Sequence, residues 1–140
     1  MQPTLAQVRD TYKDKVKIIY KDFPLSIHQN AQKAAEAARC GFAQDQEKYW
    51  AYHDKLFENA TSLTVENLKQ YAVDVKFDAA TFNTCLDSGK YAAAVNQDMA
   101  EGVKVGVSGT PAFLVNGRFL SGAQPFTAFQ EAIDEALAAQ

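Results

Sequence analysis

The chain has 140 residues, which is enough for one domain with a buried core but too few for two comfortable ones. Its composition, 47% hydrophobic and 22% charged, is typical of a globular protein. The formal charge of -3 argues against nucleic acid as a partner, because phosphate binding needs clustered lysines and arginines. No apolar run approaches the roughly 20 residues that span a bilayer, and the start, MQPTLAQVRDTYKDK, lacks the pattern of a signal peptide.

The first elements in the chain are a helix and a short strand. Residues 4–13 place Leu5, Val8 and Tyr12 at helical spacing. The following run VKIIY, residues 16–20, is rich in β-branched side chains and is bounded by a Phe-Pro break. This pattern predicts a buried strand.

Residues 28–105 are helical in pattern throughout. An alanine-rich stretch, residues 29–46, and an aromatic stretch after it each place apolar side chains on one helical face. We interpret both faces as core rather than as a ligand pocket. Their members are Ala31, Ala34, Ala35, Ala38 and Phe42 in the first stretch, and Tyr49, Trp50, Tyr52, His53, Leu56 and Phe57 in the second.

Two helix starts within this block carry the same local signature. Thr64 and Asp78 are each a preferred N-cap residue, with apolar side chains immediately before the cap and four residues after it. A last long helix is expected from about Lys90 to Val105, where Gly106 can supply the left-handed residue that ends it.

After residue 106 the hydrophobic pattern changes from helical to alternating. Residues 112–115 and 118–120 are strand-like, and Asn116-Gly117 between them is a strong hairpin signal, because a type I′ turn needs positive φ at both central positions. Pro125 opens a final amphipathic helix. Its apolar stripe consists of Phe126, Phe129, Ile133 and Leu137.

Four side chains could carry chemistry, but none has the pattern of a known site. Cys40 and Cys85 are the only thiols, and they could be two buried free cysteines or a structural disulfide; neither has a second cysteine near enough to resolve a mixed disulfide. His28 and His53 do not lie at metal-ligand spacing, and we expect His53 to be a core residue hydrogen-bonded to Asp54. There is no glycine-rich phosphate loop, so we expect neither a metal nor a cofactor.

Three stretches carry a resemblance to the DsbA-like thiol–disulfide oxidoreductases of the thioredoxin fold. The segment GVSGTPAFLVNGRFLSGAQPFTAF is similar to the C-terminal half of that fold, in which a Thr-Pro or Val-Pro pair precedes the hairpin. The segment YKDFPLSIHQNAQKAAEAARCGFAQDQEKYWAYHDKLF resembles the family's strand exit and first inserted helices. The later inserted helices are matched by TFNTCLDSGKYAAAVNQDMAEGVKVGVSGTP. The similarity extends from about residue 3 to the end of the chain, and the matching segments occur in the same order as in the family.

The resemblance implies an α/β, helix-rich fold of the DsbA type with a large helical insertion. Residues 1–140 would then form a single incomplete thioredoxin-like domain, with residues 28–105 as an inserted helical subdomain. Family members begin with a strand followed by Cys-x-x-Cys at the start of the first helix, and neither feature occurs here. We therefore assign no catalytic residue.

The missing strand has a structural consequence. In the family it lies at the centre of the sheet, between residues 16–20 and the hairpin. Without it we expect one of two repairs, since unpaired backbone groups are costly. Either residues 16–20 pair directly with residues 112–116, or a partner chain fills the gap, most simply in a strand-exchanged homodimer.

The resemblance also implies roles for individual residues of this chain. The proline is cis in the family, and the backbone before it pairs with an extended substrate peptide, so the resemblance assigns substrate binding to Thr110 and Pro111. Some subfamily members pair cysteines at the positions of Cys40 and Cys85, which implies a structural disulfide. Such a bond, and the family itself, imply a periplasmic or otherwise extracytoplasmic location and cysteine-containing polypeptides as partners.

We therefore expect a protein thiol–disulfide oxidoreductase of the DsbA type whose redox dithiol is absent from these residues. Two alternatives remain. One is a thioredoxin-like binding or structural domain that has no catalytic role. The other is a relative of the kappa-type glutathione transferases and isomerases, which share the architecture and use a serine or similar residue at the start of the first helix.

Overall fold

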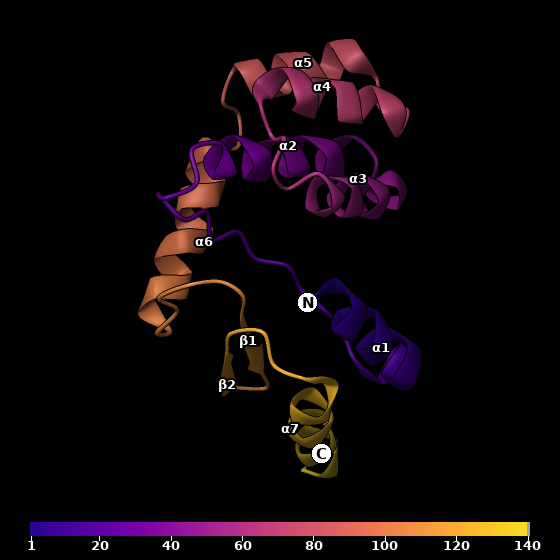
Figure 1. The fold of residues 1–140 in the computed structure, drawn as a ribbon, viewed down its shortest axis with the longest axis vertical. Helices are drawn as coiled ribbons and strands as arrows, with labels where there is room; N and C mark the ends of the chain where they lie inside the picture. The colour runs from indigo at the N-terminus through magenta and orange to yellow at the C-terminus, as the bar shows by residue number, and fades with distance from the viewer. Residues whose placement is uncertain (140) are drawn as a thin grey trace. The chain divides into compact units, whose positions relative to one another are not determined.

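The computed structural model describes residues 1–139. The chain divides into two compact units, one made of residues 22–101 and the other of residues 1–21 together with the residues from 102 onward (Figure 1). In chain order the elements are α1 (Gln2–Tyr12), a 3-10 turn (Lys13–Lys15), α2 (Ala31–Gln44), α3 (Gln46–Glu58), α4 (Val65–Asp74), α5 (Ala79–Asp87), α6 (Ala92–Lys104), β1 (Ala112–Val115), β2 (Arg118–Ser121) and α7 (Phe126–Ala138).

The unit of residues 22–101 is helical, and side-chain caps set where its helices begin. Thr64 accepts a hydrogen bond from the backbone N–H of Asn67, and Asp78 accepts one from that of Thr81. Both predicted N-caps are therefore confirmed. Asp45 caps α3 in the same way, which explains how α2 and α3 can follow one another with a single residue between them.

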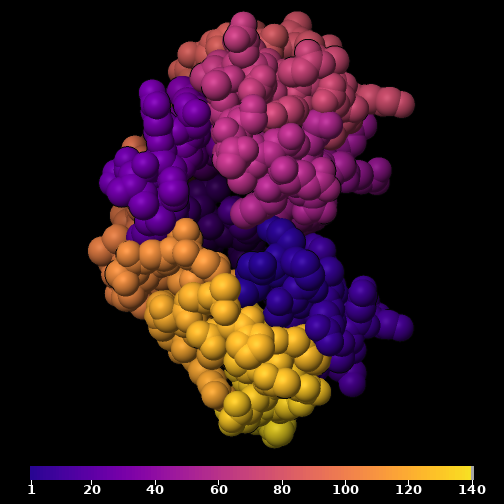
Figure 2. Space-filling model, in the orientation of Figure 1, coloured from indigo at the N-terminus to yellow at the C-terminus, as the bar shows by residue number. Residues whose placement is uncertain are grey.

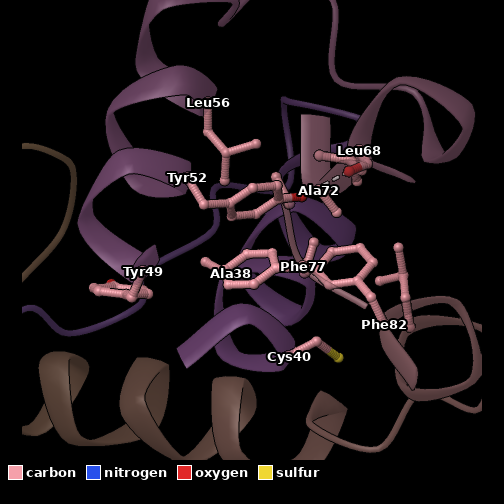
Figure 3. Packing of buried hydrophobic residues seen from close by; sticks show 12 residues of the cluster. Ala38, Cys40, Tyr49, Tyr52, Leu56, Leu68, Ala72, Phe77 and Phe82 are labelled. Carbon is pink, nitrogen blue, oxygen red and sulfur yellow. Dashed lines mark hydrogen bonds between the residues drawn. The ribbon is translucent and has the colours of Figure 1, made fainter. Parts of the chain in front are cut away.

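Aromatic rings from three segments fill the core of this unit (Figure 3). Tyr52 of α3 packs against Phe77 and Phe82, with ring centroids 5.5 Å away in each case. Its buried hydroxyl donates a 2.9 Å hydrogen bond to the carbonyl oxygen of Leu68, so the polar end of the ring is satisfied. This bond joins α3 to α4.

The predicted core face of α2 and α3 is partly wrong. Phe42, Trp50 and Phe57 are exposed. The buried face of α3 consists instead of Tyr49, Tyr52, His53 and Leu56. Positions 50 and 57 lie at the rim of that face, because each step along a helix turns the side chain by about 100°.

A buried charge cluster joins distant parts of the same unit. The guanidinium of Arg39 on α2 donates to Asp22, at 2.5 Å, and to Asp98 on α6. The backbone N–H of Asp22 also donates to Asp98, at 3.0 Å. Two buried carboxylates on their own would carry a large desolvation cost, and the arginine between them offsets it.

The other unit is built on the hairpin. Strands β1 and β2 pair antiparallel, with Ala112 opposite Ser121 and Val115 opposite Arg118. Asn116 and Gly117 have φ of 46° and 94°, so the predicted turn with two positive φ values is confirmed. Gly106, with φ of 91°, ends α6 as predicted, and the N–H of Val107 closes the helix on the carbonyl oxygen of Gly102.

One apolar cluster holds α1, the hairpin and α7 together. Phe113 of β1 meets Phe129 of α7 edge to face, with ring centroids 4.8 Å apart. All four members of the predicted stripe on α7 belong to this cluster. Tyr12 of α1 completes the contact with α7, because its hydroxyl donates to Asp134 at 2.7 Å.

The prediction of a strand at residues 16–20 is wrong. Val16 has extended backbone angles, and Val16 and Ile18 pack against the cluster of this unit. However, no ladder joins residues 16–20 to another strand, and within the described chain the sheet consists of β1 and β2 alone. Direct pairing of residues 16–20 with residues 112–116, the first expected repair, is therefore also wrong. A sequence pattern reports side-chain burial, whereas a strand also needs a hydrogen-bonding neighbour.

Replacing Gly41 tests the close packing of α2 against the aromatic core. A Cβ atom at this position would lie 2.7 Å from Cε2 of Phe77, a ring held by its neighbours. Overpacking costs about 1–3 kcal/mol, which outweighs the helix propensity of up to about 1 kcal/mol that alanine gains. We expect Gly41→Ala to lower the free energy of unfolding by about 1–2 kcal/mol in urea titrations.

The double variant with Phe77→Ala provides the control. With the ring removed, the same Gly41→Ala change should be neutral or stabilising, because only the propensity gain remains. The same loss of stability in both backgrounds would show that the ring contact is not the cause.

The contact between α1 and α7 makes a pH-dependent contribution to stability. Burial, together with the hydrogen bond to the carboxylate of Asp134, raises the pKa of Tyr12 to about 12. Because this pKa is higher than that of an unfolded tyrosine, about 10, the contribution is complete below pH ~10 and is lost as the pH rises through the folded value.

We expect Tyr12→Phe to lower the free energy of unfolding by about 1–2 kcal/mol at pH 7. The difference between variant and wild type should shrink between pH ~10 and ~12, measured by chemical unfolding at each pH. A difference that stays constant across this range would contradict the assignment.

Candidate functional site

The candidate site is the loop that connects α6 to β1. It follows the glycine that ends α6 and contains Ser108, Gly109, Thr110 and Pro111. The peptide bond between Thr110 and Pro111 is cis. Part of the stretch around residues 100–120, orange in Figure 2, lies at the molecular surface.

The hairpin holds the Pro111 end of this loop through a hydrogen bond, whereas the backbone of Thr110 is not held in this way. The carbonyl oxygen of Pro111 accepts a 2.9 Å hydrogen bond from the N–H of Gly122, one residue beyond β2, so it continues the pairing of the two strands. Thr110 is exposed, and its backbone N–H and carbonyl make no hydrogen bond within the described part of the chain. A main-chain donor and acceptor are therefore presented next to an ordered strand, which is the geometry that extends a sheet by one more peptide.

The two cysteines form a disulfide. Cys40 of α2 and Cys85 of α5 are 45 positions apart in sequence, and their Cα atoms are 6.0 Å apart. Cys40 is buried next to the aromatic core, and no free cysteine occurs in the described residues. The bond joins two helices of the unit of residues 22–101, whereas Thr110 and Pro111 belong to the other unit.

The histidines do not form a catalytic constellation. His28 is exposed in a turn, where its backbone N–H donates to the carbonyl oxygen of Leu25. His53 is buried, and its Nδ1 lies 3.0 Å from a carboxylate oxygen of Asp54, as expected from the sequence. Across residues 1–139, no three His, Cys, Asp or Glu side chains come together in a way that could hold a metal ion.

Two features of the structure were not found by sequence reasoning. One is the hydrogen bond from Gly122 to Pro111, which depends on the hairpin register. The other is the Asp22–Arg39–Asp98 cluster; its only sequence signal is a lone arginine within the alanine-rich run AAEAARCG. Among the residues described, none of the helices is both long and apolar enough to cross a membrane.

Comparison with known proteins identifies the family to which this chain belongs. A family model described as "Thioredoxin" matches residues 1–135. The crystal structure of a thioredoxin-like oxidoreductase from Silicibacter pomeroyi superposes with a TM-score of 0.82 at 26% sequence identity, covering 99% of this chain and 80% of that one. The fold is therefore thioredoxin-like, as the sequence predicted, and the chain belongs to the thioredoxin family.

Curated relatives have names that describe a more specific function. These proteins are longer than this chain. "Probable disulfide bond formation protein D" of Bacillus anthracis is 27% identical over 142 aligned positions, covering 95% of this chain and 64% of that protein. "Na(+)/H(+) antiporter NhaA 3" of Salinispora tropica is 34% identical over 124 positions, covering 88% of this chain. The chain spans only 19% of the antiporter's length. The chain therefore matches only part of each of these two curated relatives.

The contribution of the disulfide to stability can be measured directly. Replacing both Cys40 and Cys85 by alanine frees a loop that spans 45 positions in the unfolded chain. The chain-entropy estimate for such a loop is about 4 kcal/mol, and the loss of stability should fall between about 2 and 4 kcal/mol. Urea unfolding of the double variant gives this value.

The wild-type protein in a strong phosphine reductant serves as the matched control and should lose a similar amount. A loss below about 1 kcal/mol in both samples would mean that the bond does not stabilise the helical unit.

Proposed function

We propose that this chain is part of a DsbA-type protein thiol–disulfide oxidoreductase and that it supplies the surface on which a substrate polypeptide docks. The observation that carries the proposal is Thr110, an exposed residue just before β1, whose backbone N–H and carbonyl have no hydrogen-bond partner in the described chain. The name of the Bacillus anthracis relative and the description of the Silicibacter pomeroyi structure support the same class.

The proposal assigns docking, and not disulfide exchange, to these residues. Exchange needs a thiolate that attacks and a second cysteine that resolves the mixed disulfide. The 140 residues contain no Cys-x-x-Cys, and their two cysteines are bonded to one another. We therefore propose a structural role for the bond between Cys40 and Cys85.

The compartment and the partners follow from the same chemistry. A disulfide between two helices is stable in an oxidising environment, which supports action outside the cytoplasm, in the periplasm or an equivalent space. The substrates are polypeptides with cysteines, recognised through their main chain. A second copy of the chain is a further proposed partner, as a strand-exchanged homodimer.

The docking proposal predicts a binding site centred on Thr110. The ligand for the test is an extended ten-residue peptide with serine in place of cysteine, added to the ¹⁵N-labelled chain. We expect the amide signals of Gly109, Thr110 and Ala112 to shift, because strand addition forms main-chain hydrogen bonds at these positions. The same peptide with alternate amides N-methylated should bind at least about tenfold more weakly, since it has lost its donors.

Shifts confined to other surfaces, or equal binding of the methylated peptide, would contradict docking at this loop. A redox assay separates docking from exchange. Insulin reduction by the chain should stay at background, and activity that Cys40→Ser abolishes would contradict the structural role of the disulfide. Retention on immobilised glutathione would instead favour the transferase alternative.

A further inference from the structure

Gly122 holds the docking loop, residues 108–111, against the hairpin. In the register of the two strands, residue 122 lies opposite residue 111, one position beyond the pair of Ala112 and Ser121. At a hydrogen-bonded pair of an antiparallel ladder, the two residues exchange two main-chain bonds. Pro111 has no N–H, so this pair has only the 2.9 Å bond from the N–H of Gly122 to the carbonyl oxygen of Pro111. The end of the loop therefore depends on one donor.

This bond determines the direction in which the loop leaves the sheet. The ring of Pro111 fixes the φ angle of this residue near about -65°. Its ψ angle sets the direction of the carbonyl group, which is held by the bond to Gly122. With both angles determined, the peptide group that precedes Pro111 has a defined direction, because a peptide group is planar and rigid. The carbonyl of Thr110 belongs to this peptide group, so Gly122 governs where it points.

The conformation of Gly122 is one that other residues rarely adopt. Its φ is 78°, in the left-handed region, where the chain turns out of β2 while the N–H still faces Pro111. The side-chain amide of Gln124 donates to the carbonyl oxygen of Ser121 at 2.7 Å and closes this turn. A Cβ atom added at Gly122 would meet nothing within 4 Å. A side chain here is therefore disfavoured by the backbone angle and not by a clash.

We propose that Gly122 is a positioning residue of the docking site, which orients the backbone of Thr110 through its bond to Pro111. This inference rests on the docking function proposed above. It needs the left-handed conformation and the N–H of residue 122, but no side chain. Substitutions should therefore be tolerated in the order in which residues accept positive φ. Glycine accepts it best, then asparagine, then alanine, and β-branched valine least.

NMR of the chain without ligand tests the positioning itself. We expect Gly122→Ala to move or broaden the amide signals of Thr110 and Ala112, because part of the population loses the bond to Pro111. Gly122→Asn should change them much less. Gly117→Ala is the matched control, because Gly117 also has positive φ, 94°, and open space around an added Cβ, but lies in the turn at the other end of the hairpin. It should lower stability and leave the signal of Thr110 unchanged.

Peptide affinity measures the consequence for docking. The ligand is the ten-residue serine peptide described above, titrated at a temperature at which every variant is folded. We expect the dissociation constant to rise about fivefold or more for Gly122→Ala, which is the factor by which the left-handed conformation is disfavoured for a residue with a Cβ. Gly122→Val should weaken binding further, and Gly122→Asn should largely restore it. The affinity of Gly117→Ala should equal that of the wild type, which separates positioning from a general loss of stability.

Two results would overturn the proposal. One is an unchanged amide signal of Thr110 in Gly122→Ala, which would show that the loop does not depend on residue 122. The other is wild-type affinity of Gly122→Ala for a peptide that still binds at Thr110; docking would then stand and positioning would fail. If the peptide does not bind the wild type, the docking function is wrong, and the amide signals of the free chain decide whether Gly122 positions the loop.

Discussion

The antiparallel pairing of β1 and β2 is the interaction on which the candidate site depends. The hydrogen bond from Gly122 to the carbonyl of Pro111 continues this pairing one residue past the strands and fixes the end of the loop. The hairpin is itself positioned by Phe113, which packs on Phe129 of α7. Thr110, an exposed residue, is therefore held in place by contacts that run from the apolar cluster of α1, the hairpin and α7 through Phe113 and Pro111.

The unit of residues 22–101 is stabilised by different means. Its core is a set of aromatic rings around Tyr52, and a covalent bond and a buried charge cluster join its helices. None of these groups has the geometry of a catalytic centre. The disulfide constrains the unfolded chain, and Arg39 compensates two buried carboxylates. The proposal above gives both groups a role in stability.

The sequence predicts best those features that depend on a few neighbouring residues. The caps at Thr64 and Asp78 and the Asn116-Gly117 turn are local, because the side chain or backbone that defines each one lies within four positions. The pairing of Cys40 with Cys85 is not local, and it was inferred from family resemblance rather than from spacing.

The failures concern long-range geometry. Residues 16–20 have the pattern of a strand, but the neighbour that would make them one is not among the residues described. Around the axis of α3, Trp50 and Phe57 lie next to the buried face. Whether a side chain at such a position is buried or exposed depends on how the neighbouring helices pack. The Asp22–Arg39–Asp98 cluster joins positions far apart in sequence, so no local window contains it.

The central claim is that these residues provide structure and docking while their disulfide takes no part in exchange. The midpoint potential of Cys40–Cys85, measured by mass spectrometry in dithiol redox buffers, tests it most directly. Because Cys40 is buried in the core and the bond joins two packed helices, the account predicts a potential below about -300 mV, as for structural disulfides. A midpoint between about -120 and -270 mV, the range of thioredoxin-like catalysts, would contradict it.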